Sequence, residues 1–260
     1  LQSTVSYKER TIKDIPYGDW DTDYDRFYHE VPEGKLPEPE EGKELIFSFF
    51  YSWLNRRPHA KNIRLPVQGY GISVSEDYAS KSLFGDFTYT RLGTESFINF
   101  KLPGPGILYG RLKTQIMLGD PPAQDALALT RDPSIYLGFL VAQESHNPRG
   151  WDEVRLGDRL VFGTLEYRVP FISEFPINIL GFTLGSTSIA LFSDFANAWK
   201  SDEELDNWVT TAGYEIKIAL QAEKSPVLFF SVGQAQEIND WQDEVVPDDW
   251  YMRFALINPF

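Results

Sequence analysis

The sequence predicts an all-β fold, part of a transmembrane antiparallel β-barrel. Three observations lead to this prediction. Apolar and polar residues alternate along successive segments, long and short connections alternate between them, and the final segment ends on an aromatic residue. Alternation with a period of two gives each face of a strand its own set of side chains, whereas a helix would scatter them. The segments are about ten residues long, the length that a tilted strand needs to cross a membrane.

Composition excludes several classes of protein. The chain has 260 residues and a formal net charge of −14, so it lacks the basic surface that nucleic-acid binding requires, and we expect no nucleic-acid partner. The absence of cysteine excludes disulfides, thiolate zinc sites and cysteine nucleophiles. No stretch approaches the roughly 20 apolar residues of a membrane-spanning helix. Because the chain begins at Leu1 and not at methionine, we expect it to be processed or to belong to a longer protein.

Two regions differ in their pattern. Residues 1–44 are acidic and punctuated by proline, and we expect an acidic loop, a linker or the end of a preceding segment there. Residues 45–260 carry the strand pattern, interrupted by a long loop around residues 119–158. We expect ten strands in this second region, at residues 45–54, 65–74, 84–92, 96–102, 107–118, 159–171, 182–199, 211–221, 227–235 and 250–258.

The connections between these strands alternate in length. Short connections and longer acidic ones follow each other along the chain, the short ones at residues 102–106, 172–176 and 222–226 and the long ones at residues 119–158, 200–207 and 236–249. Outer-membrane barrels of bacteria have short turns on the periplasmic side and long loops outside. If the chain ends in the periplasm, each connection falls on the side that its length predicts. A water-soluble β-sandwich also alternates apolar and polar residues, so it stays an alternative.

Two neighbouring segments each carry a carboxylate in the middle of the expected strand. Glu166 lies on the polar face of residues 159–171, and Asp194 lies on the corresponding face of residues 182–199. A charge at such a position is costly unless a partner or water is near. We therefore expect Arg149, in the loop just upstream, to turn inward and to pair with Asp194, Glu166 or both.

The opposite faces of the strands are expected to contact lipid. Alternation assigns twelve apolar side chains to them, namely Leu165, Tyr167, Val169, Leu191, Phe195, Tyr214, Ile216, Ile218, Leu228, Phe230, Phe254 and Leu256. Aromatic residues near the strand ends are consistent with the girdles that such barrels place at the membrane interfaces.

The C-terminal segment ends in Phe260. Counting back from this residue, alternate positions hold Leu256, Phe254 and Met252. The arrangement resembles the sorting signal of bacterial outer-membrane barrels, which implies that the outer-membrane assembly machinery is a partner. Asn258 departs from the apolar or aromatic residue that is usual at its position. An ordinary terminal strand that happens to stop at phenylalanine is the alternative.

Three short motifs follow each other in a characteristic order. These are Pro148-Arg149-Gly150-Trp151, Gly163-Thr164-Leu165-Glu166 and Phe192-Ser193-Asp194-Phe195-Ala196. They resemble the loop-tip motif and the motifs of the two following strands in the BamA/TamA superfamily, also called bacterial surface antigens. Two positions depart from the family pattern, since Pro148 replaces an apolar residue and Ala196 replaces a glycine. In that family the loop folds back into the barrel lumen and its arginine pairs with inward carboxylates.

The resemblance implies a barrel of sixteen strands, five of which follow the loop. Here five expected strands follow Arg149 and five precede it, so about ten of the sixteen are present, and the remaining barrel strands would come from the same parent protein. An integral protein of the bacterial outer membrane is implied, with a non-enzymatic role in outer-membrane protein insertion and assembly or in polypeptide transport. Its partners would be the lipid bilayer and unfolded polypeptide clients or accessory lipoproteins.

Two other functions are compatible with the sequence. The barrel could be an anchor or exporter for a fused soluble domain, such as a patatin-like lipase or a propeller, because some relatives carry the same barrel behind such a domain. The chain could also be a soluble β-sandwich that acts as a binding module. Domains upstream of the barrel would discriminate the first alternative, and solubility without detergent would discriminate the second.

Catalytic chemistry is not indicated. The histidines at positions 29, 59 and 146 are scattered through expected loops, and the motifs of nucleophile elbows and phosphate-binding loops are missing. Glu166 and Asp194 could form a general acid and base pair. Ion pairing with Arg149 explains all three residues, however, so we expect no enzyme, no catalytic residue, no metal and no cofactor.

Overall fold

The computed structural model describes residues 1–11, 40–59, 62–129, 148–151, 155–172, 178–179, 182–205, 207–222, 227–238 and 249–257. This part of the chain is all-β, with two short 3-10 helices, η1 (Lys81–Leu83) and η2 (Ala123–Asp125). None of its helices is long and apolar enough to cross a membrane. Its strands are β1 (Gln2–Arg10), β2 (Gly42–His59), β3 (Asn62–Ala79), β4 (Thr88–Lys101), β5 (Ile107–Asp120), β6 (Leu127–Leu129), β7 (Arg155–Gly157), β8 (Arg159–Ile172), β9 (Asn178–Ile179), β10 (Phe182–Trp199), β11 (Val209–Ala222), β12 (Val227–Glu237) and β13 (Asp249–Ile257).

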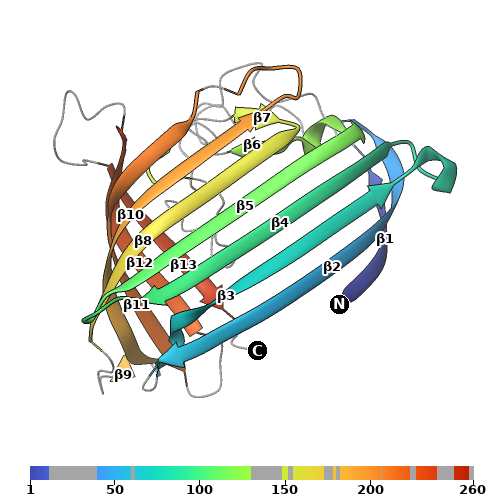
Figure 1. Ribbon diagram of the computed structural model, residues 1–260. Coiled ribbons are helices and arrows are strands. Elements are labelled where there is room, and N and C mark those ends of the chain that lie inside the picture. Colours follow the sequence, from blue (N-terminus) through green and yellow to red (C-terminus); the bar gives the residue numbers. More distant parts are fainter. Residues whose placement is uncertain are drawn as a thin grey trace, which may run out of the picture.

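The large sheet is a strongly curved antiparallel meander (Figure 1). Its strands follow the order β1-β2-β3-β4-β5-β8-β10-β11-β12-β13, and β9 pairs with β10 off this path. Strands β6 and β7 form a second, two-stranded sheet. Among the described residues β1 and β13 each pair with one neighbour, so they form the two edges of the large sheet.

Strands β4 and β1 correct the predicted list. Residues 84–92 and 96–102 were expected as two strands, but Thr88–Lys101 is one continuous strand because Gly93 pairs with Ser75 of β3 and with Gln115 of β5. The expected start at Phe84 is also wrong, since this residue ends η1 in the left-handed region with φ 65°. At the other end of the sheet, the prediction of a loop or linker does not hold for Gln2–Arg10, which pairs with β2.

Among the described residues, five strands of the large sheet therefore precede Arg149 and five long ones follow it. The predicted numbers are the same, because the merged strand and the additional strand β1 compensate each other. The predicted alternation of connections is confirmed at the short connections of residues 102–106 and 222–226. Between β8 and β10, where a short connection was expected at residues 172–176, the strands end at Ile172 and resume at Phe182, with β9 between them. Short connections join β4 to β5 and β11 to β12 at one end of the sheet. The much longer connection between β5 and β8 lies at the opposite end, as does the connection from β10 to β11, and we refer to this as the loop end.

The two faces of the sheet have opposite character. On the convex face, six of the predicted apolar side chains are more than one third exposed: Leu165, Tyr167, Leu191, Phe195, Tyr214 and Ile216. Val169 and Ile218 are intermediate, and the side chains of Leu228, Phe230, Phe254 and Leu256 lie outside the described ones. The concave face buries charged and polar groups, including Glu44, Glu166, Asp194 and Glu215, each less than 5 % exposed. These charged groups share the concave face with buried apolar side chains, whereas the convex face exposes large apolar side chains where a water-soluble sheet would carry mainly polar ones.

The β6–β7 sheet fills the concave side at the loop end (Figure 1). Leu127 and Leu129 of β6 are buried against apolar side chains from the inner faces of the large sheet, among them Ile46, Ala79, Tyr89, Met117, Leu160, Phe162, Ala196 and Ala198. Strand β7 continues this contact, because Gly157 lies against the backbone of Trp199. Asp158, directly after β7, donates its N–H to the carbonyl oxygen of Trp199 at 3.0 Å. Together β6 and β7 form a crossbar between the two halves of the curved sheet.

The contact between β7 and β10 generates the first prediction. A Cβ atom added to Gly157 would lie 2.2 Å from the carbonyl oxygen of Trp199 and 2.5 Å from its nitrogen, and backbone atoms cannot move aside cheaply. We expect Gly157→Ala to lower the free energy of unfolding by about 1–3 kcal/mol, as overpacking does elsewhere. Chemical denaturation followed by tryptophan fluorescence measures the change. Gly110→Ala is the matched control, because its Cβ would meet its nearest atom, from Ile98, at 3.4 Å. Equal stability of the two variants would contradict the prediction.

Candidate functional site: a buried arginine cage

Arg149 lies in a tight turn that reaches the concave face of the sheet. The N–H of Trp151 donates to the carbonyl oxygen of Pro148 at 3.3 Å, which closes the turn. Gly150 adopts φ 77°, and a Cβ atom there would lie 2.8 Å from the Cβ of Ala235 on β12. Glycine is therefore required at this position for two reasons, its backbone conformation and its close approach to the sheet.

All five N–H groups of the Arg149 guanidinium find an acceptor. Nε donates to Asp194 Oδ2 at 2.8 Å, and Nη2 donates to Asp194 Oδ1 at 2.6 Å and to Thr164 Oγ1 at 2.7 Å. Nη1 donates to Glu166 Oε1 at 2.9 Å and to Glu215 Oε1 at 2.8 Å. The backbone N–H of Arg149 adds a bond to Asp194 Oδ2 at 3.0 Å. The planar, five-donor shape of guanidinium matches this set of acceptors, which an ammonium group could not satisfy.

Two further cations complete the cluster. Arg168 Nε lies 2.6 Å and Lys217 Nζ 2.8 Å from Glu166 Oε2, and Lys217 Nζ also lies 2.7 Å from Glu215 Oε1. Three cations thus face the three carboxylates, so the formal charges of the cluster sum to zero. We refer to this cluster, made of Arg149, Arg168, Lys217, Glu166, Asp194 and Glu215, as the cage. Burial lowers the pKa of Arg149, but attraction by Asp194, Glu166 and Glu215 outweighs it and raises that pKa well above its usual range. The arginine therefore stays charged in the folded protein.

Aromatic rings and glycines pack closely in the strands around Arg149. The guanidinium carbon of Arg149 lies 3.4 Å from the centre of the Phe192 ring, which stacks on it from β10. Gly213 of β11 makes space for that ring, since a Cβ there would lie 2.9 Å from Phe192 Cζ. On the convex face the ring of Phe195 covers Gly163, whose Cβ would lie 2.1 Å from it.

The structure brings together most of the site residues that the motifs predicted. The predicted ion pairs of Arg149 are present with both Asp194 and Glu166, which lie on β10 and β8. Trp151 is buried beside the turn, with Arg155 5.5 Å from its ring centre. Sequence reasoning missed Glu215 and the cations Arg168 and Lys217 as members of the cluster. Alternation is the signal that could have found them, because Arg168 lies two residues after Glu166 and Glu215 and Lys217 share one face of their strand.

The predicted C-terminal signal is described only in part. Met252, Phe254 and Leu256 belong to β13 and pair in register with Val232, Phe230 and Leu228 of β12. Phe260 lies outside the described residues. The assembly signal therefore stays a prediction.

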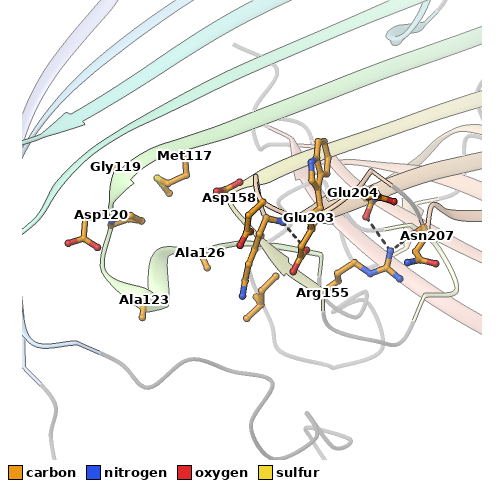
Figure 2. Close-up of a pocket in the computed structure, with 18 residues that line it drawn as sticks. Met117, Gly119, Asp120, Ala123, Ala126, Arg155, Asp158, Glu203, Glu204 and Asn207 are labelled. Carbon is orange, nitrogen blue, oxygen red and sulfur yellow. Dashed lines mark hydrogen bonds between the residues drawn. The ribbon is translucent and has the colours of Figure 1, made fainter.

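A cavity of about 1030 Å³ opens at the loop end (Figure 2). It is lined by the end of β5, the crossbar and the connection from β10 to β11. Arg155 crosses this region and donates to Asn197 Oδ1 at 3.2 Å and to the carbonyl oxygen of Asn207. In the described part of the chain, no three acidic or histidine side chains gather as metal ligands.

The chemical role that this geometry supports is anchoring. Glu166 and Asp194 are buried and ion-paired, and each carboxylate already accepts from at least one cation. No family model matches the sequence. A search of curated proteins also finds no match. Fold and site thus define an antiparallel β-sheet protein. A buried arginine in the long connection between β5 and β8 forms ion pairs with the concave face of its sheet.

The cage generates the second prediction. Arg149→Ala leaves three buried carboxylates with two cations, so we expect a loss of stability on the order of 3–5 kcal/mol. Arg149→Lys keeps the charge but offers three donors in place of five, so we expect an intermediate loss of about 1–3 kcal/mol. Denaturant titration of the purified chain measures both.

Arg159→Ala serves as the control for a generic arginine loss. Arg159 is partly exposed and donates to two carbonyl oxygens, of Met117 at 3.1 Å and of Asp158 at 3.2 Å. We expect it to cost about 1 kcal/mol or less. If Arg149→Ala were no more destabilising than Arg159→Ala, the cage would not be an anchor.

Proposed function

We propose that this chain is the C-terminal part of a BamA/TamA-type transmembrane β-barrel in the bacterial outer membrane, supplying about ten of its sixteen strands. We further propose that it acts without catalysis, in the insertion and assembly of outer-membrane proteins or in polypeptide transport. The observation that carries the proposal is the position of Arg149, anchored through Asp194 and Glu166 on the charged concave face of a sheet whose convex face is apolar.

The exposed convex face supports the membrane part of the proposal. Large apolar side chains more than one third exposed follow one another on β2, β3, β4, β5, β8, β10 and β11, from Trp53 and Ile72 to Leu191 and Ile216. A monomer in water rarely exposes a continuous apolar surface of this extent, whereas lipid requires one. A charged pair, Lys43 with Glu9 at 3.4 Å, lies near the loop end.

The edges of the sheet suggest how such a protein would work. An edge strand presents unpaired N–H and C=O groups, which can template an incoming extended segment. Strand β13 is one edge of the described sheet, and we propose that it forms one side of a seam where client strands pair. Lipid requires all backbone groups to be satisfied, so further strands of the parent protein would complete the barrel. The loop held by Arg149 would steady its interior.

The third prediction tests the membrane. Ile216 is exposed on the convex face, and its neighbour Lys217 points to the concave face. We expect Ile216→Arg to cost roughly 2–4 kcal/mol near the bilayer midplane. Lys217→Arg keeps a positive charge beside Glu166 and Glu215 and should change stability little. Folding titrations into lipid vesicles measure both variants, and equal tolerance at the two positions would argue against a membrane barrel.

The fourth prediction concerns the C-terminus. If Phe260 completes an assembly signal, its deletion should lower the yield of barrel in the outer membrane. It should barely change the thermal stability of protein that has already folded, because one terminal side chain contributes little packing. Membrane fractionation and thermal melting separate the two effects. Unaltered yield would remove the C-terminus from the proposal.

The functional test uses the full parent protein in lipid vesicles. Unfolded outer-membrane barrel protein is added, and the fraction that becomes membrane-inserted and protease-resistant is compared with protein-free vesicles. An increase that is lost with Arg149→Ala supports a role in insertion. If insertion is unchanged and the parent protein carries a lipase or propeller domain ahead of the barrel, the anchor or exporter function is favoured instead.

A further inference from the structure

A second, partly buried ion network lies on the concave face, away from Arg149. Arg10, the last residue of β1, contacts Glu44 of β2 and donates from Nη2 to Asp125 Oδ2 at 2.7 Å. Arg91 of β4 lies 3.6 Å from the same Asp125 oxygen. Tyr89 donates from its hydroxyl to Glu44 Oε2 at 2.8 Å. Two cations thus face two carboxylates, and the network joins three strands of the large sheet to η2.

Asp125 belongs to the segment that leads into the crossbar. Residues 123–125 form η2 and residues 127–129 form β6, whose leucines are buried against the large sheet. The segment has a second tie to the start of β2, because Gln124 and Ala123 exchange hydrogen bonds with Glu40, all at 2.9 Å. Through β7 the crossbar is fixed to β10 at Trp199. Contacts with the large sheet on both sides of Asp125 therefore fix its position relative to Arg10.

Within the described part of the chain, strand β1 has few other contacts with the interior. Seven of its nine residues are exposed, and the other two are Ser6 and Arg10. An edge strand without apolar burial depends on its backbone pairing alone, and such pairing opens easily when it is exposed to solvent. Arg10 is the point at which β1 reaches the buried interior, with its side chain 16 % exposed beside a fully buried Glu44.

We propose that Asp125 is a clasp that fixes the edge strand β1 to the interior through Arg10. The pairing of β1 with β2 then depends on a residue that is 115 positions away in sequence and belongs to the connection between β5 and β8. Loss of the Asp125 carboxylate would loosen one edge of the sheet while leaving the contacts of Arg149, further along the same connection, in place. The inference rests on the contacts of Arg10 and Asp125 and on the exposure of β1, and it does not require the proposed function.

Hydrogen exchange of the purified full chain, followed by mass spectrometry, tests the clasp. Asp125→Asn keeps the shape and removes the charge, and we expect the amides of β1 to exchange roughly tenfold faster or more, because charged hydrogen bonds restrain local opening. The amides of β8, β10 and β11 should be unchanged. Asp120→Asn is the matched control on the same connection, since Asp120 is exposed at the end of β5.

Arg10→Gln removes the other partner of the same ion pair and leaves the residues of the crossbar unchanged. It should accelerate exchange of β1 as Asp125→Asn does, whereas Lys8→Gln, at an exposed position of the same strand, should not. Arg10→Gln also removes the ion pair with Glu44, so the double variant should exchange no faster than Arg10→Gln alone. Unchanged exchange of β1 in Asp125→Asn would overturn the proposal, as would a double variant that exchanges faster than Arg10→Gln alone.

Discussion

The charged concave face depends on one guanidinium group. Asp194, Glu166 and Glu215 are removed from water, and each would be strongly destabilising there without a cation. Arg149 contacts all three at once, and only a planar group with five donors can do so from one position. Because the arginine comes from a loop and the carboxylates come from three consecutive strands, one interaction ties the loop, β8, β10 and β11 together.

Strand β10 contacts both the Arg149 cage and the crossbar formed by β6 and β7. Its middle supplies Asp194 and the stacked ring of Phe192, and its end at Trp199 receives the crossbar. The cage and the crossbar therefore lie on the same strand at different heights. Such an arrangement makes the loop a structural member of the concave face, whereas loops more often lie over the surface and contribute few contacts.

The ion network around Arg149 and the one around Asp125 differ in their burial and in the part of the sheet that they stabilise. In the cage, Arg149 and the three carboxylates are each at most 5 % exposed, so removal of the arginine leaves buried carboxylates that solvent cannot compensate. Around Asp125 the arginines keep 16 % and 27 % of their side-chain surface, and solvent can partly compensate for a lost partner. The first network thus secures the body of the sheet, and the second secures an edge that can open without unfolding the rest.

Local patterns determined much of this protein. Period-two alternation is a property of neighbouring residues, so the sequence by itself placed Glu166 and Asp194 on one face and predicted their pairing with Arg149. Register between distant strands is different, because it is set by backbone pairing and packing along the whole sheet. Only the tertiary structure could bring Glu215 and Lys217 to the same cage, continue β4 through Gly93, and fix polar Gln2–Arg10 as a strand. The clasp between Arg10 and Asp125 has the same cause, since nothing in either local sequence specifies the other.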